Sequence, residues 1–448
     1  MTGKTKDLTV GNPLKLIIGF AIPIFFGILF QQFYGLVDTM IVGRTLGVDA
    51  LAAVGATGSI TFLVIGLCNG IASGFAIPVA QRFGAKDERG LKRVLANSVY
   101  LGIVISVVVT VIVVALCRSI LEFMNTPENI IDNAYAYLIV VFAGIPITFF
   151  YNLFSGFMRS LGDSKTPVLF LISGCAINIF LDYFLIVTIG MGVEGAGYAT
   201  VISQLFAALG SGIYMYKRFP VVHMTHEERR FDGQASALLC YMGFPMGLQY
   251  SITALGSVIL QISVNGLGSS CVAAMTAGCK IALFAVSMID ALGSTMATYA
   301  GQNVGAKQLE RVSKGLKQTC IVGIIYAVGA CIFVSVFGEK LALLFVDPTE
   351  TEIINNIALY LKTESGFYVL LVLVNCVRFC IQGMGFSGFA VFAGVMEMIA
   401  RVLVAFFLVP ILGYLGACLA SPIAWILADV FLVPAFFSVM KKLKVRFA

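Results

Sequence analysis

The sequence predicts an all-α polytopic membrane protein with twelve transmembrane helices in two pseudo-symmetric six-helix lobes around a central cavity. Three observations lead to this fold class. The 448 residues are 59% hydrophobic and 12% charged, with a mean hydropathy of +0.97, so a soluble fold would expose very large apolar surfaces. Apolar stretches long enough to span a membrane recur along the whole chain, and the second half repeats the first.

Twelve apolar stretches have the length that a helix needs to cross a hydrocarbon core of about 30 Å. They cover residues 14–40, 51–80, 94–117, 133–157, 166–190, 195–216, 237–264, 271–300, 318–345, 357–384, 388–412 and 414–440. We therefore expect each half of the chain to contribute six spans.

Lysine and arginine residues lie mainly on one side of the predicted membrane. If both termini are cytoplasmic, the inner segments hold 22 of the 29, the outer segments hold three, and four lie within spans. Because positive residues in short loops stay inside, this predicts a multi-pass protein of the plasma (inner) membrane with cytoplasmic termini. The net charge of +6 then reflects topology, so we expect no nucleic acid partner. The basic tail "KKLKVRF" suits contact with anionic membrane lipids.

Residue types that carry catalysis or bind metals are sparse. The eleven cysteines are scattered, mostly within spans, with no CxxC pair, and the two histidines, His223 and His226, lie in one loop. No nucleophile with a base, and no set of metal ligands, converges within the spans. We expect no enzyme activity, no cofactor, and no metal ion other than Na⁺ as a coupling ion.

The two halves match at a displacement of 221 residues. "AQRFGAK" from Ala80 matches "GQNVGAK" from Gly301, and "GVEGAGYAT" matches "GYLGACLAS"; small gaps bring Pro23 to Pro245 and Asn152 to Asn375. Since six spans is an even number, the halves are parallel repeats. We predict an amino-terminal lobe over residues 1–221, a hydrophilic cytoplasmic linker over 222–236 and a carboxy-terminal lobe over 237–448.

Acidic residues within the spans are the main functional signal, because an ionised side chain at the bilayer centre costs at least ~2.5–3.5 kcal/mol. The six are Asp38, Asp182, Asp290, Glu364, Glu397 and Asp429. Asn178 and Asp182 are four residues apart and share a helical face. A carboxylate beside an amide oxygen suits a proton or Na⁺, and the Thr200 hydroxyl would complete the site if the next helix folds back. The alternative is a polar clamp between helices.

Polar residues of the second half form a different pattern. Glu397 and Arg401 are four apart and suit mutual neutralisation, so we predict a structural role for them. For Lys280 we keep three alternatives open: it pairs with Asp290, it extends to the membrane surface, or it lines the cavity. Direct pairing within one helix is disfavoured because ten residues span about 15 Å.

Several motifs together resemble those of the multidrug and toxic compound extrusion (MATE) transporters, over essentially the full chain. They are "QQFYGLVDTMIVG" with the preceding Pro23, "AQRFGAK", "FMRSLGDSKTPV" from Phe157 to Val168, "NIFLDYF" and "GAGYAT". The resemblance, within the MOP flippase superfamily, implies a cation-coupled (H⁺ or Na⁺) multidrug antiporter. It would export small organic, often cationic or amphipathic, xenobiotics by a rocker-switch, and we expect a monomer.

The resemblance to the DinF-like branch of the family implies which residues serve the site. The coupling residues would be Asp38, Asn178, Asp182 and Thr200, with Pro23, Tyr34 and Tyr137 in supporting or substrate-cavity positions. The NorM-like branch uses a carboxylate in the seventh span, where this chain has Thr253. The carboxy-terminal lobe thus offers Lys280, Asp290, Glu397 and Arg401 as polar candidates only. The alternative function is a lipid-linked precursor flippase of the same superfamily, which would favour a cationic cavity.

Overall fold

The computed structural model describes residues 6–124 and 126–447, and within them it contains helices and no strand. Residues 1–5, 125 and 448, which include the first and last residues of the chain, lie outside the described part. The first repeat comprises α1 (Pro13–Thr45), α2 (Val48–Gly84), α3 (Glu88–Phe123), α4 (Glu128–Ala143), α5 (Ile145–Ser160), α6 (Lys165–Asp182), η1 (Tyr183–Thr188) and α7 (Val193–Arg218), followed by η2 (Pro220–Val222). The second comprises α8 (Gly233–Asn265), α9 (Ser269–Gly305), α10 (Leu309–Ala342), α11 (Thr351–Ser365), α12 (Tyr368–Gly383), α13 (Gly388–Leu403), η3 (Val404–Leu408), α14 (Val409–Leu412), α15 (Tyr414–Cys418) and α16 (Ala420–Phe447).

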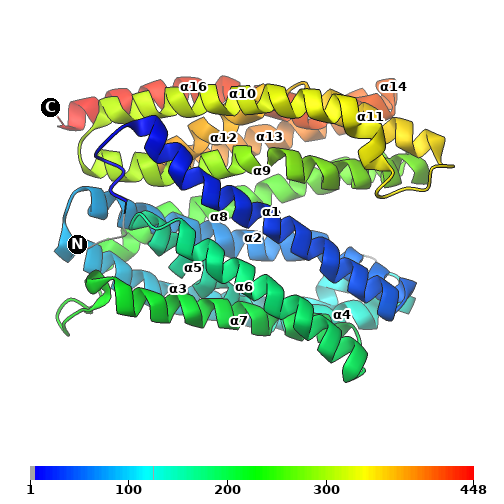
Figure 1. Cartoon of the computed structure of the whole chain (residues 1–448), viewed down its shortest axis with the longest axis horizontal. Coiled ribbons are helices and arrows are strands. Elements are labelled where there is room, and N and C mark those ends of the chain that lie inside the picture. Colours follow the sequence, from blue (N-terminus) through cyan, green and yellow to red (C-terminus); the bar gives the residue numbers. More distant parts are fainter. Residues whose placement is uncertain (1–5, 125, 448) are drawn as a thin grey trace. The chain divides into compact units, whose positions relative to one another are not determined.

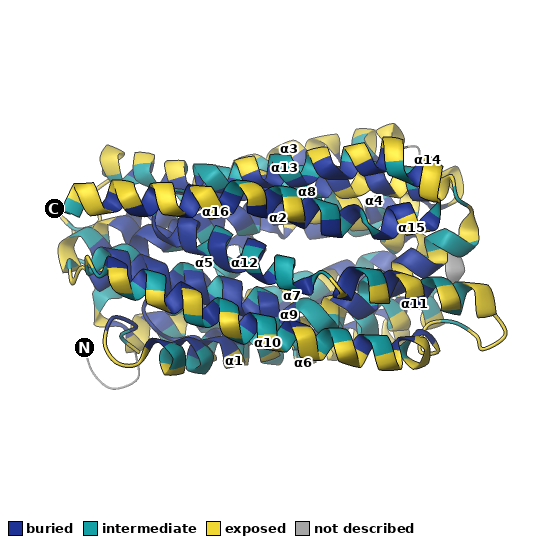
Figure 2. Cartoon of the chain, turned by 90° about the horizontal axis from the view of Figure 1, so that it is seen from above, coloured by how far each residue is buried: buried dark blue, intermediate teal, exposed yellow. Residues whose placement is uncertain are grey.

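Ten helical segments in the described residues are long and apolar enough to cross a membrane, and two bent helix pairs bring the number to twelve. The bent pairs are α4 with α5, at 46°, and α11 with α12, at 51°. They replace the straight fourth and tenth spans that the sequence predicts. Exposed positions occur along the lengths of the helices (Figure 2). On α3 they include large apolar side chains, those of Val104, Val108 and Val111, which suits contact with lipid. The predicted polytopic all-α fold is confirmed.

The bend between α4 and α5 has a local cause. Gly144 lies between the two helices, and a Cβ at this position would overlap the side chain of Val201 on α7. Pro146 follows at the start of α5, where its missing N–H leaves no intrahelical hydrogen bond unmade. The close approach of α7 therefore requires glycine at the bend.

Both halves repeat unusual backbone features at equivalent positions. Lys86 and Lys307 are the two non-glycine residues with positive φ, 57° and 58°, among the described residues. A π-helix follows α6 in the first half and α13 in the second. The sequence repeat is therefore also a structural repeat.

The chain forms two compact units, and two of their boundaries fall inside helices. The first unit consists mainly of Phe26–Gly247, and the second of Leu8–Phe25 with Leu248–Ala448. The two boundaries inside helices each lie two residues after a proline, Pro23 in α1 and Pro245 in α8, and a third lies between Asp7 and Leu8. The predicted lobe limits, at 221 and 237, lie in η2 and in the first turns of α8, and they stay a prediction, as do the cytoplasmic termini.

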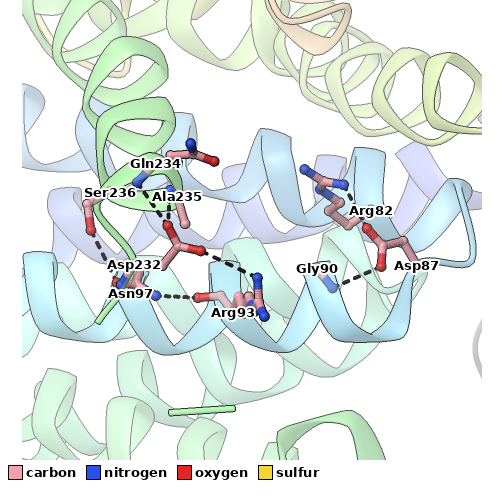
Figure 3. Close-up of polar contacts among 9 residues, drawn as sticks. All are labelled: Arg82, Asp87, Gly90, Arg93, Asn97, Asp232, Gln234, Ala235 and Ser236. Atoms are coloured by element: carbon pink, nitrogen blue, oxygen red, sulfur yellow. Dashed lines mark hydrogen bonds and ion pairs between the residues drawn. The ribbon is translucent and has the colours of Figure 1, made fainter. Parts of the chain in front are cut away.

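The segment between the repeats is tied to α3 within the first unit (Figure 1). Lys92 Nζ lies 2.9 Å from Glu228, and the Tyr100 hydroxyl donates to the Arg229 carbonyl over 2.8 Å. The side-chain Oδ1 of Asn97 accepts from the Asp232 N–H over 2.9 Å and from the Ser236 hydroxyl over 3.2 Å (Figure 3). Three positions along one helix therefore hold the linker and the start of α8.

Carboxylates cap two helices in the same region (Figure 3). Asp232 accepts from the backbone N–H groups of Gln234 and Ala235, and Asp87 accepts from that of Gly90, at the starts of α8 and α3. The Gly90 N–H and the Arg82 guanidinium hold the pKa of Asp87 below its usual value. These caps stabilise the starts of α3 and α8.

Candidate functional site

Two buried carboxyl groups meet in the first unit. Asp38 lies in the last third of α1, with 9% of its surface exposed, and Asp182 is the last residue of α6, with 0% exposed. The wider turn of the π-helix η1 begins directly after Asp182. The two carboxyl groups are within hydrogen-bonding reach of each other. The structure thus brings together two acids that lie 144 residues apart in the sequence.

A hydroxyl group on α7 connects three helices beside these acids. Thr200 Oγ1 lies 3.2 Å from the Tyr34 hydroxyl of α1 and accepts from Asn178 Nδ2 of α6 over 3.4 Å. Asn178 is one turn before Asp182 on the same face of α6, and 1% of its surface is exposed. The fold-back of α7 along α6, on which the sequence prediction depended, is present, because the two helices pack against each other.

Several oxygens of this group have no donor. One oxygen of Asp38, the amide oxygen of Asn178 and both oxygens of Asp182 are buried, and no described residue donates a hydrogen bond to them. Ionised carboxylates only accept hydrogen bonds, so two of them in contact repel unless a proton or cation lies between them. The donor set of two carboxylates, an amide oxygen and a hydroxyl suits a proton or Na⁺.

The supporting residues divide between the two units. The Tyr34 and Tyr137 hydroxyls lie close to both carboxyl groups, Tyr137 from α4. Pro23 does not join them, since it lies fifteen residues before Asp38 on α1 and belongs to the other compact unit. Among the predicted site residues of the first half, only Pro23 is therefore remote, about 22 Å along the helix.

A chain of polar contacts crosses the second unit. Asp290 accepts from Asn375 over 2.8 Å, Asn375 accepts from Arg378 over 2.7 Å, and Arg378 lies 2.9 Å from Glu397. Arg401 is 4.0 Å from the other Glu397 oxygen. The helical neighbour that the sequence predicts as the partner of Glu397 is thus the more distant of two.

The buried acids of the second unit all have an arginine near them. Asp290 and Asp429 lie close to Arg378, and Glu364 lies close to Arg401. The described residues offer no such cation to Asp38 or Asp182. The two units therefore differ in electrostatics, because the four buried acids of the second share two arginines and the described residues give Asp38 and Asp182 none.

The surroundings of Glu364 were missed by sequence reasoning, although its charge was noted. Its carboxyl group is within hydrogen-bonding reach of the Tyr360 and Ser421 hydroxyls, and Tyr360 lies 3.2 Å from Cys279 Sγ. Tyr360 and Ser421 are the repeat counterparts of Tyr137 and Thr200. The repeat, applied to the supporting residues and not only to the acids, was the signal that could have found this group.

Lys280 does not pair with Asp290, which was one of its three predicted roles. Asp290 binds Asn375, and within residues 6–124 and 126–447 no ion pair of Lys280 is present. Its side chain is half-buried on α9. Of the alternatives, pairing with Asp290 is therefore not observed.

Comparison with known proteins identifies the family. The sequence profile of the MatE family matches residues 23–184 and 245–407, one match in each repeat. The chain belongs to the MATE family. It is 33% identical over 362 residues to the "Probable multidrug resistance protein YoeA" of Bacillus subtilis, which covers 78% of this chain and 77% of the relative. It is 23% identical to an "FAD transporter" of Shewanella oneidensis over 79% of each chain.

Solved structures of MATE proteins share this fold. One, described as the outward-facing conformation of a multidrug resistance MATE family transporter of the MOP superfamily, matches with a TM-score of 0.91 and 24% identity over 99% of both chains. Another, a MOP superfamily transporter from Pyrococcus furiosus described as having reverse polarity of its binding pocket, matches with a TM-score of 0.90 and 24% identity over 99% of both chains. This MATE protein is thus a multi-pass membrane transporter, not an enzyme.

Proposed function

We propose that this MATE protein is an antiporter that exports organic, often cationic or amphipathic, compounds in exchange for H⁺ or Na⁺. The observation that carries the proposal is the contact between Asp38 and Asp182, two buried carboxyl groups to which the described part of the chain brings no cationic side chain. Such a pair needs a mobile positive charge, which either a coupling ion or a cationic substrate supplies. The two would therefore exclude each other.

The coupling follows from electrostatics. With both acids ionised, the site carries two negative charges in a poorly hydrated region and attracts a cation strongly. Entry of H⁺ or Na⁺ from outside neutralises one charge, and the affinity for a cationic substrate falls. A difference of about 5.5 kcal/mol between the two states suffices to invert their populations from 1:99 to 99:1. Asn178 and Thr200 would hold the ion through their oxygens.

The relatives support export over lipid flipping. Proteins of two Bacillus subtilis genes that align with most of this chain are described as multidrug resistance proteins. Another relative is described as an "FAD transporter", which names a different substrate. The experiment below therefore measures transport of an organic cation directly. Presence of all four coupling residues supports membership of the DinF-like branch. A precursor flippase would need a cationic pocket, and the Asp38 and Asp182 site is acidic.

Transport in proteoliposomes tests the proposal. Efflux of a fluorescent organic cation is measured under separately imposed pH and Na⁺ gradients, for the wild type and for Asp38→Asn and Asp182→Asn. We expect both variants to lose gradient-driven efflux, because an amide neither takes up a proton nor carries charge. Thr200→Ser, which keeps the hydroxyl as Ser421 does in the second half, should retain it.

Asp132→Asn is the matched control, because Asp132 lies on α4 of the same unit and its side chain is 80% exposed. It should transport at the wild-type rate. Wild-type rates in both Asp38→Asn and Asp182→Asn under every gradient would disprove the site. Flipping of a lipid-linked substrate without efflux of any organic cation would favour the alternative function.

A further inference from the structure

Exposed positive side chains gather at one end of the second unit, where α10 begins and α16 ends. We call this set the basic patch. It consists of Lys307, Lys314, Lys317, Lys441, Lys442, Lys444 and Arg446. Glu310 is the acidic residue of these two helix ends in the described part of the chain. The patch therefore carries a large positive excess.

The fold joins these cations into one surface. α10 and α16 pack against each other, and their lysine-rich ends lie at the same end of the unit (Figure 1). Lys307 Nζ lies 5.9 Å from the centroid of the Phe447 ring, which places the loop before α10 next to the end of α16. Both helices are apolar enough to span a membrane. The basic patch thus lies where the apolar spans end, at the level of lipid headgroups.

None of the ion pairs in the described residues involves a cation of the patch. At the equivalent end of the first unit three cations have carboxylate partners, because Lys92 pairs with Glu228, and Arg82 with Asp87 and Arg93 with Asp232 (Figure 3). Positive residues that only set topology could be paired in the same way. The lack of partners therefore calls for another explanation.

The repeat shows where the partners are missing. Lys307 corresponds to Lys86, and both adopt positive φ in the same turn. The residue after each differs: Asp87 caps α3 and pairs with an arginine, whereas Gln308 makes no side-chain cap to α10. Arg311, three residues after Gln308, donates hydrogen bonds to the carbonyls of Leu8 and Gly11, so it is engaged inside the second unit. The cations of the basic patch have no such ion pair and are available to an external anion.

We propose that the basic patch binds phospholipids whose headgroups carry net negative charge, in the leaflet that surrounds this end of the second unit. Each lysine or arginine near an anionic surface contributes about 1 kcal/mol, or about fivefold in affinity. Seven unpaired cations at the ends of two adjacent spans meet this requirement. The phosphodiester oxygens of the lipid would take the place of the carboxylate partners that the cations of the patch do not have.

Lipid competition on the full-length protein tests this proposal. The purified chain in detergent is mixed with equimolar phosphatidylglycerol and phosphatidylcholine, and the bound lipids are counted by native mass spectrometry. We expect the wild type to prefer phosphatidylglycerol. The variant K441Q/K442Q/K444Q/R446Q should lose at least about tenfold of this preference, and added salt should weaken it in the wild type.

The control variant K86Q/R89Q/K217Q/R218Q removes the same charge from exposed positions of the first unit and should keep the preference. K441R/K442R/K444R, which keeps the charge, should also bind as the wild type does. If the tail variant fails to fold, K314Q/K317Q on α10 should still lower the preference. The proposal is overturned if the wild type shows no preference, if the patch variants keep it in full, or if the control loses as much.

Discussion

The Arg378 guanidinium lies 2.9 Å from the Glu397 carboxylate, and both side chains are nearly buried, with 11% and 5% exposed. Arg401, one helical turn from Glu397, is 4.0 Å away. Removal of one member of a buried pair leaves an uncompensated charge and costs about 3–5 kcal/mol. We therefore expect Arg378→Leu to lower the free energy of unfolding by about this amount, and Arg401→Leu to lower it less. Thermal unfolding in detergent measures both. Equal losses would show that the two arginines share the role.

Two glycine pairs hold α2 against the first half of α8. A Cβ on Gly70 would lie 2.6 Å from Gly247 Cα, and one on Gly74 would lie 2.5 Å from Gly243 Cα. Such contacts force the backbones apart, so we expect Gly70→Ala and Gly74→Ala to destabilise the protein by about 1–3 kcal/mol.

Gly58→Ala is the matched control, because a Cβ at this position of α2 has nothing within 4 Å. Alanine is the better helix former by about 1 kcal/mol, so this variant should unfold at the same or a higher temperature. A similar loss in all three variants would mean that α2 tolerates no alanine for reasons other than its contact with α8.

Local sequence patterns predicted much of this fold. Apolar length identified the spans, and the four-residue spacing placed Asn178 and Asp182 on one face of α6, because both depend only on helix geometry. The bends after Ala143 and Ser365 were not predicted. In the first, glycine is required by Val201, a residue of another helix. Period and hydropathy within one segment contain no information about such a contact.

The candidate site shows the same limit. The contact of Asp38 with Asp182 was expected only through the family resemblance, since 144 residues separate them. The Arg378 partner of Glu397 depends on how α12 packs on α13, whereas the helical spacing indicated Arg401. Charge counting found the acids, but only the fold shows which acids have arginines beside them.

Glu228 should make the attachment of the linker to α3 dependent on pH. The Thr225 backbone N–H and the Lys92 ammonium hold its pKa below the usual value of 4.5. A lowered pKa in the folded state means that the stabilisation is fully present above the usual pKa and is lost as the pH falls through the lowered value. The protection of residues 223–232 against hydrogen exchange, taken relative to the intrinsic rate at each pH, should therefore fall only in acid.

Glu228→Gln provides the comparison, because it removes the charge but keeps the shape. At neutral pH its linker should exchange faster than that of the wild type, and the difference should vanish once Glu228 is protonated. A difference that persists in acid would assign the protection to the other contacts, such as the Tyr100 hydroxyl on the Arg229 carbonyl.

Glu364 distinguishes a compensated acid from an ion site. It has the Tyr360 and Ser421 hydroxyls within reach, as the first-half acids have Tyr137 and Thr200 nearby, but it also has Arg401 close to it. Because the nearby Arg401 offsets part of its charge, we expect it to function without a mobile ion. We expect Glu364→Gln to keep gradient-driven efflux, slowed at most about tenfold through lost hydrogen bonds, whereas Asp182→Asn abolishes it. Loss of coupling in Glu364→Gln would instead indicate a second ion position, and the number of ions exchanged per substrate would then fall in that variant.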